Sequence, residues 1–199
     1  NVSEHLTLAD VSNVPVSLTF SFQETPVTYD SIKNLLDVIK STTNAGLQKA
    51  ISHHVVVGIV SQRWSSVQCG TKLLLLDHNR LCEHLFYQLT LRRFAVMPQV
   101  PLGTGVPIHS YIRAALDLPE AQWKPSDGNK EDIAERATSL LLEKASMLAE
   151  YFSIGIEAST GMMDTSGTTP TLTYIPELVP THRPCPQQLP MFLLRLATD

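Results

Sequence analysis

Two proline-rich stretches constrain the fold of this chain more than any other feature. Residues 97–107 hold three prolines and two glycines, and a second proline cluster spans residues 176–190. Because proline has no backbone N–H and a fixed φ, neither stretch suits a helix interior or a central strand. The sequence therefore predicts two lobes, with residues 98–186 inserted between residues 1–97 and 187–199.

Hydrophobic periodicity predicts a mixed α/β fold of the α+β kind. Alternation at period two and β-branched runs indicate strands, whereas apolar residues three and four apart indicate helices. The predicted strands are residues 17–23, the hairpin of 53–60 with 71–76 around a polar loop, and the pair 153–157 with 172–175. The predicted helices are residues 28–39, 44–51, 77–92, 108–116, 130–152 and 189–197.

Composition limits the classes of function. The 199 residues carry a formal net charge of -4, whereas proteins that bind nucleic acids usually present a basic surface. No apolar run reaches the ~18 residues that a membrane span needs. Three cysteines without a metal-type spacing favour a reducing compartment, the nucleus or the cytosol. We therefore expect neither direct nucleic-acid binding nor membrane insertion.

The chain passes from an apolar strand into an amphipathic helix at Asp77, and Asn79, Arg80, Glu83 and Gln88 follow on that helix. This layout resembles the C-terminal domain of MutL-type DNA mismatch-repair proteins. Nuclease members of that family carry the metal-binding motif D-Q-H-A-x2-E-x4-E after such a strand. Asp77 and Glu83 match the motif. Asn79 stands in place of its histidine, Arg80 in place of its alanine and Gln88 in place of its final glutamate.

The matching carboxylates do not suffice for a metal-dependent nuclease, which needs several anionic or imidazole ligands converging on one ion. Asp77 is better explained as the N-cap of the helix, and Glu83 as a first-turn carboxylate that interacts favourably with the helix dipole. Arg80 places a positive charge where the ion would lie. We therefore predict a domain without catalytic residues, metal or cofactor. The alternative is a diverged metal-dependent endonuclease of the MutL C-terminal type.

Further blocks of sequence are similar to the eukaryotic MutL homologue that lacks the nuclease motif, the common subunit of the MutL heterodimers. These blocks are residues 54–60 with Trp64, then 71–76, 83–88, 144–153 and 189–198. The resemblance covers roughly residues 17–199. It implies a dimerisation lobe built from residues 1–97 and 187–199 and an external lobe formed by residues 98–186.

The resemblance also implies a function in protein association. The chain would hold a nuclease-bearing MutL paralogue in a heterodimer in the nucleus, and would offer a docking surface to repair partners such as an exonuclease. Obligate interfaces resemble a core cut in half, so the apolar strands and the last helix are the best interface candidates. The candidate residues are Val55, Val57, Ile59, Leu73, Leu75, Phe192, Leu193 and Leu196.

Overall fold

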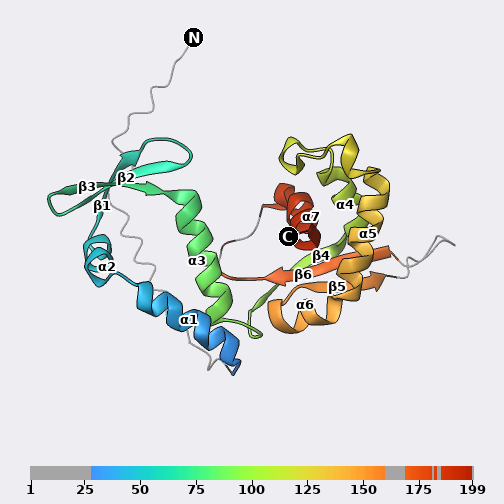
Figure 1. Cartoon of the computed structure of the whole chain (residues 1–199), viewed down its shortest axis with the longest axis horizontal. Helices are drawn as coiled ribbons and strands as arrows, with labels where there is room; N and C mark the ends of the chain where they lie inside the picture. The colour runs from blue at the N-terminus through green and yellow to red at the C-terminus, as the bar shows by residue number, and fades with distance from the viewer. Residues whose placement is uncertain (1–27, 160–168, 181, 183–184, 199) are drawn as a thin grey trace, which may run out of the picture.

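The computed structural model describes residues 28–159, 169–180, 182 and 185–198, which form two lobes (Figure 1). The first lobe comprises α1 (Asp30–Thr42), α2 (Ala45–Ser52), β1 (Val55–Ile59), β2 (Trp64–Cys69), β3 (Lys72–Asp77) and α3 (His78–Arg92). The second comprises β4 (Gln99–Pro107), α4 (Ile108–Ala115), η1 (Pro119–Ala121), η2 (Pro125–Asp127), α5 (Lys130–Glu143), α6 (Ala145–Phe152), β5 (Gly155–Ser159), β6 (Thr169–Pro176), η3 (Pro186–Gln188) and α7 (Leu189–Thr198). Helices combined with two antiparallel sheets confirm the predicted mixed α+β class. The predicted strand at 17–23 lies outside the described residues.

The described sheet of the first lobe has the order β1-β2-β3, with antiparallel neighbours. The prediction of a hairpin around a polar loop is wrong, because most of that loop forms the central strand β2. The apolar pattern does not predict this strand, because Ser65, Ser66 and Gln68 make it polar. Val67, which is 1% exposed, anchors β2, and Gly70 adopts a φ of 62° in the turn to β3.

Helix α3 follows β3 directly and leads toward the second lobe. Asp77 is its N-cap, as predicted, with a side chain that accepts a hydrogen bond from the backbone N–H of Arg80. Glu83 lies beyond the first turn, where no acidic residue occurs, so its predicted place in that turn is wrong. Near the other end of the helix Leu89 and Leu91 are buried, and α1 packs alongside α3.

The second lobe is built around a sheet of order β4-β6-β5. One hydrophobic core joins this sheet to α4, α5, α6 and α7. Its fully buried side chains include Ile108 and Ile112 of α4, Leu172 of β6 and Leu193 of α7. The largest continuous core of the described residues therefore lies in this lobe.

The proline-rich stretch at 97–107 is an edge strand. Strand β4 pairs with β6 at both of its ends, and the register shifts between Pro101 and Val106. Within that irregular part Gly103 and Gly105 have φ values of 68° and 83°, which glycine adopts without steric cost. Proline is tolerated at a sheet edge and at a bulge because no ladder bond needs its missing N–H there.

The predicted long helix over residues 130–152 consists of two helices, so that prediction is wrong. Helix α5 ends at Glu143 and α6 begins at Ala145, with Lys144 between them at φ -89° and ψ 2°. Leu141 before the break and Leu148 after it are both buried. Since the apolar stripe continues across the break, side-chain spacing alone gives no sign of it.

Helix α7 packs against α4 and α5 of the second lobe (Figure 1). The sequence interpretation grouped residues 187–199 with the first lobe, and the proposed division of the chain at residues 97 and 187 stays a prediction. Among the described residues, no helix has both the length and the apolar character that crossing a membrane requires.

Candidate partner interface and degenerate metal site

Asp77, at the end of β3, is engaged on both oxygens of its carboxylate. Oδ2 accepts hydrogen bonds from Nε and Nη2 of Arg63 at 3.0 and 2.7 Å, and Oδ1 accepts from the backbone N–H of Arg80 at 3.3 Å. The side chain is 11% exposed. The hydrogen bond from Arg63, together with those from the backbone of Arg80 and Asn79, lowers the pKa of the Asp77 carboxyl below its ordinary value.

Arg63 is a neighbour of Asp77 that the sequence analysis did not identify. The sequence analysis places Arg80 as the cation near Asp77. In the structure Arg80 is exposed, and it contacts Asp77 through its backbone N–H. Arg63 comes from the turn before β2, and its guanidinium also lies over the ring of Trp64, 5.4 Å from the centroid. The strand register, which pairs Trp64 with Asp77, brings them together. Only knowledge of the β2–β3 pairing would have revealed it.

The other positions of the degenerate motif do not gather around Asp77 as a ligand set. Asn79 and Glu83 are exposed and Gln88 is half-buried. In the part of the chain that the structure describes, no group of three or more His, Cys, Asp or Glu side chains is placed to hold a metal ion. The expectation of a domain without metal or catalytic residues stays a prediction, and the engagement of Asp77 supports it.

The first sheet presents an apolar face to solvent. Residues that pair across antiparallel strands share a face. Val55 pairs with Gln68, which pairs with Leu73, and the next row includes Ser66 and Leu75. Leu73 is 65% exposed and Leu75 57%. The face therefore has exposed aliphatic side chains on its outer strands and polar side chains in its centre.

Two further interface candidates of β1 differ from this row. Val57 lies where the register between β1 and β2 shifts, and it is 57% exposed. Ile59 pairs with Ser65, the neighbour of Ser66, so its side chain points to the opposite face of the sheet. Ile59 is nevertheless 81% exposed. Aliphatic side chains are thus uncovered on both faces of β1.

The candidates on α7 lie in different surroundings. Leu193 has no exposed surface and belongs to the core of the second lobe, and Leu196 packs against the same core. Phe192 is 36% exposed. The structure therefore does not bring these three residues to the exposed face of the first sheet, and their role in an interface stays a prediction.

Phe192 borders an apolar hollow of about 590 Å³ between α3, the end of β6 and α7. Phe86 of α3 and Phe152 of α6 contribute other parts of its wall. Sequence analysis did not identify this hollow, because its lining comes from segments far apart in the chain. Its apolar walls suit an apolar side chain or small molecule.

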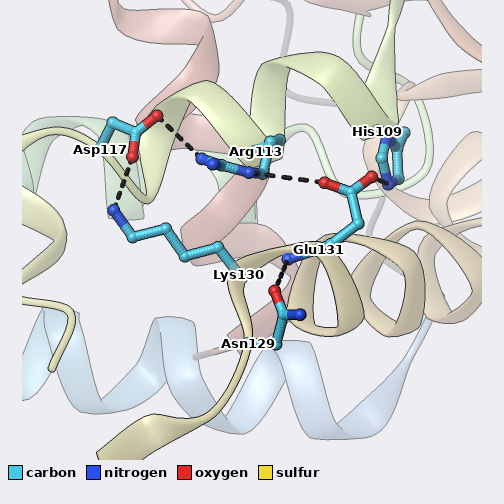
Figure 2. Close-up of polar contacts among 6 residues, drawn as sticks. All are labelled: His109, Arg113, Asp117, Asn129, Lys130 and Glu131. Atoms are coloured by element: carbon cyan, nitrogen blue, oxygen red, sulfur yellow. Dashed lines mark hydrogen bonds and ion pairs between the residues drawn. The ribbon is translucent and has the colours of Figure 1, made fainter. Parts of the chain in front are cut away.

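A network of charged side chains holds the connection between α4 and α5 (Figure 2). The carboxylate of Asp117 accepts hydrogen bonds from Lys130 and Arg113, and these lower its pKa below the ordinary value. Glu131 contacts Arg113 and His109 at 3.5 and 3.2 Å. Each of the two carboxylates thus contacts basic side chains, and the network links α4 with the start of α5 at the surface. The residues drawn are His109, Arg113, Asp117, Asn129, Lys130 and Glu131.

The mixed α+β fold, in which strand β3 passes directly into helix α3 at Asp77, is consistent with a MutL-type C-terminal domain. A family model described as "DNA mismatch repair protein Mlh1 C-terminus" matches residues 28–199. The chain belongs to this family.

Relatives with curated descriptions agree with this assignment. The "DNA mismatch repair protein Mlh1" of Dictyostelium discoideum is 35% identical over 169 residues, which cover 85% of this chain and 18% of that protein. The "Putative MutL protein homolog 1" of Schizosaccharomyces pombe and the "DNA mismatch repair protein MLH1" of Saccharomyces cerevisiae are each 28% identical. They match 84% and 87% of this chain and 22% of their own lengths. The chain thus spans about a fifth of the length of these relatives.

Proposed function

We propose that this chain is a non-catalytic heterodimerisation module of a MutL-type DNA mismatch-repair complex that acts in the nucleus. Its partner is a nuclease-bearing MutL paralogue. The observation that carries the proposal is the exposed apolar face of the first sheet. Membership of the Mlh1 C-terminal family supports the assignment to mismatch repair.

The sheet face has the chemistry of an interface core. Val55, Leu73 and Leu75 are each more than half exposed, and none of the residues in their rows carries a charge. Fully burying one such aliphatic side chain stabilises by about 1.5–3 kcal/mol. The exposed Gln68 between Val55 and Leu73 supplies a polar group to which a partner can hydrogen-bond. Exposed aliphatic side chains gathered on one sheet face support its assignment as an interaction site.

The strand–helix junction supports a non-catalytic role. To act as a metal ligand Asp77 would have to give up the hydrogen bonds from Arg63 and from the N-terminus of α3. The remaining motif positions offer one carboxylate, Glu83, and two amides. The alternative of a diverged endonuclease needs ligands that the described residues do not bring together.

The test is pairing with the C-terminal domain of a nuclease-bearing MutL paralogue. We expect Leu75→Glu to abolish the heterodimer in light scattering after gel filtration, because pairing would bury an unpaired carboxylate. Leu140→Glu is the matched control, since Leu140 is 41% exposed on α5 of the second lobe. Normal pairing of a folded Leu75→Glu protein, or loss of pairing with Leu140→Glu, contradicts the proposed interface.

A second role is docking of repair partners such as an exonuclease, and the apolar hollow beside Phe86 and Phe192 favours it. We expect Phe86→Gln to weaken binding of a fluorescently labelled exonuclease fragment while leaving heterodimerisation intact. Tyr87→Gln, a neighbouring exposed position that does not line the hollow, is the control. Equal binding by both variants contradicts docking at the hollow.

A further inference from the structure

Phe94, two residues after the end of α3, belongs to a cluster of aromatic rings with the second lobe. Phe94 stacks on Tyr151 of α6, with centroids 5.5 Å apart and planes at 14°, and it meets Phe152 edge to face at 5.5 Å. Tyr29, just before α1, meets Phe94 and Tyr151 edge to face at 5.5 and 5.8 Å. Aromatic pairs attract one another in both geometries. Four aromatic rings from the two lobes thus form one cluster at the boundary between the lobes.

Arg93 adds a polar contact beside this cluster. Its Nη1 donates hydrogen bonds to the carbonyl oxygens of Glu177 and Leu178, both at 3.1 Å. These carbonyls belong to the segment that leaves β6, more than 80 residues further along the chain. Hydrogen bonds from a charged donor are about twice as strong as neutral ones. One side chain of the first lobe therefore fixes the position of a backbone segment of the second.

The backbone between the lobes is held as well. The N–H of Ala95 donates to the carbonyl oxygen of Tyr151 at 3.0 Å, and the Ser153 hydroxyl donates to the carbonyl oxygen of Met97 at 2.8 Å. Ala95 has a φ of 65°, in the left-handed region that a residue with a Cβ seldom occupies. Such a conformation persists only where the surrounding contacts impose it.

We propose that residues 93–95 are a latch that holds the two lobes in one relative orientation. The contacts of Arg93 and Phe94 with the second lobe keep the latch closed. When these contacts break, the backbone rotates at the left-handed Ala95. Because each lobe has its own sheet, opening the latch changes the angle between the lobes without unfolding either one. The latch is a property of this chain alone and does not depend on the proposed heterodimer.

The latch also determines the shape of the apolar hollow. Phe86 and Thr90 of α3 form one wall, whereas Phe152, Ile175 and Leu189 of the second lobe form the other. Opening the latch separates these walls. A ligand that contacts both walls therefore stabilises the closed latch. By the same linkage, a closed latch raises the affinity for such a ligand.

The test is the distance between the lobes in the free protein. Cys82 is an exposed native cysteine on α3, and Glu135→Cys adds an exposed site on α5, so spin labels at these positions span the junction once Cys185 is replaced by serine. Arg93→Met removes the hydrogen-bond donor and keeps the apolar stem. Phe94→Leu removes the ring stacking. Arg136→Met is the matched control, because the Nε of Arg136 donates within its own helix.

We expect one narrow distance distribution for the parent protein and Arg136→Met, and broader ones for Arg93→Met and Phe94→Leu. Hydrogen exchange of the Ala95 amide should accelerate at least about tenfold in Arg93→Met. Losing hydrogen bonds from a charged donor destabilises the closed contact enough to raise the population of its open form by about that factor. Circular dichroism must show both variants folded. An unchanged distance distribution in both folded variants, or unchanged exchange at Ala95 in Arg93→Met, overturns the latch.

Discussion

Arg63 and Asp77 form an ion pair in which two nitrogens of one guanidinium donate to a single carboxylate oxygen, at 3.0 and 2.7 Å. Asp77 is also the residue that the sequence analysis matches with the first position of the MutL nuclease motif. The guanidinium of Arg63 therefore binds the carboxylate that this match proposes as a metal ligand. The junction of β3 and α3 is held by this pair and by the helix cap, so its local structure needs no bound cation.

The first prediction concerns the pH dependence of this ion pair. Its hydrogen bonds lower the pKa of Asp77 below the ordinary value of 3.8. A carboxyl with a depressed folded pKa stabilises the protein above its unfolded pKa and loses that contribution as the pH falls through the folded pKa. Asp77→Asn keeps a good capping residue but removes the charge. Its urea-unfolding free energy should be below the parent's at pH 7, and the difference should shrink below pH 3.8.

Asp37→Asn serves as the control, because Asp37 forms an exposed ion pair with Lys40 within α1, at 3.4 Å. Exposed pairs of this kind contribute little to stability. We expect a smaller loss of stability than in Asp77→Asn at pH 7. A difference between Asp77→Asn and the parent that stays constant down to pH 2 would show that the ion pair does not stabilise the fold.

The second prediction is that the domain does not nick supercoiled plasmid DNA in the presence of manganese. Asp77 is already engaged, and Asn79 and Gln88 present neutral amides where the motif has an imidazole and a carboxylate. The protein should therefore leave plasmid as intact as a protein-free sample. Nicking that disappears on Asp77→Ala would contradict the prediction and support the endonuclease alternative.

Side-chain spacing predicted the helices and strands in which apolar residues recur at a regular interval. Helices α1, α4 and α7 fall where apolar periodicity placed them. It failed for the polar strand β2, whose partners β1 and β3 stabilise it through backbone pairing rather than through an apolar pattern. It failed again at Lys144, because the apolar stripe is compatible both with one helix and with two helices that share a core.

The candidate site was predictable only in part for the same reason. Asp77 is a local feature, since a helix cap is determined by residues within one turn. The Arg63 contact depends on strand register. The exposure of Leu73 and Leu75 depends on which face of the sheet the helices cover. The contact and the exposure both depend on how segments far apart in the chain pack together, and the spacing of residues along the sequence does not predict them.

The third prediction concerns Ser153, which is 6% exposed and donates its hydroxyl to the carbonyl oxygen of Met97 at 2.8 Å. Ser153→Ala leaves a buried carbonyl without this partner, which costs about 1–3 kcal/mol. Urea unfolding should show that loss. Ser139→Ala on the exposed side of α5 is the control and should stay within about 0.5 kcal/mol of the parent. Equal stability of the two variants would show that water replaces the Ser153 bond.

The fourth prediction separates stability from pairing at α7. Leu193 has no exposed surface and packs in the core of the second lobe, so Leu193→Ala should destabilise the fold by about 2–5 kcal/mol. Leu73→Ala removes an exposed side chain of the sheet face and should leave stability nearly unchanged while weakening heterodimerisation. The comparison requires partner affinity at a temperature at which circular dichroism shows both variants folded. If Leu193→Ala weakens affinity there and Leu73→Ala does not, the interface lies at the last helix and not at the first sheet.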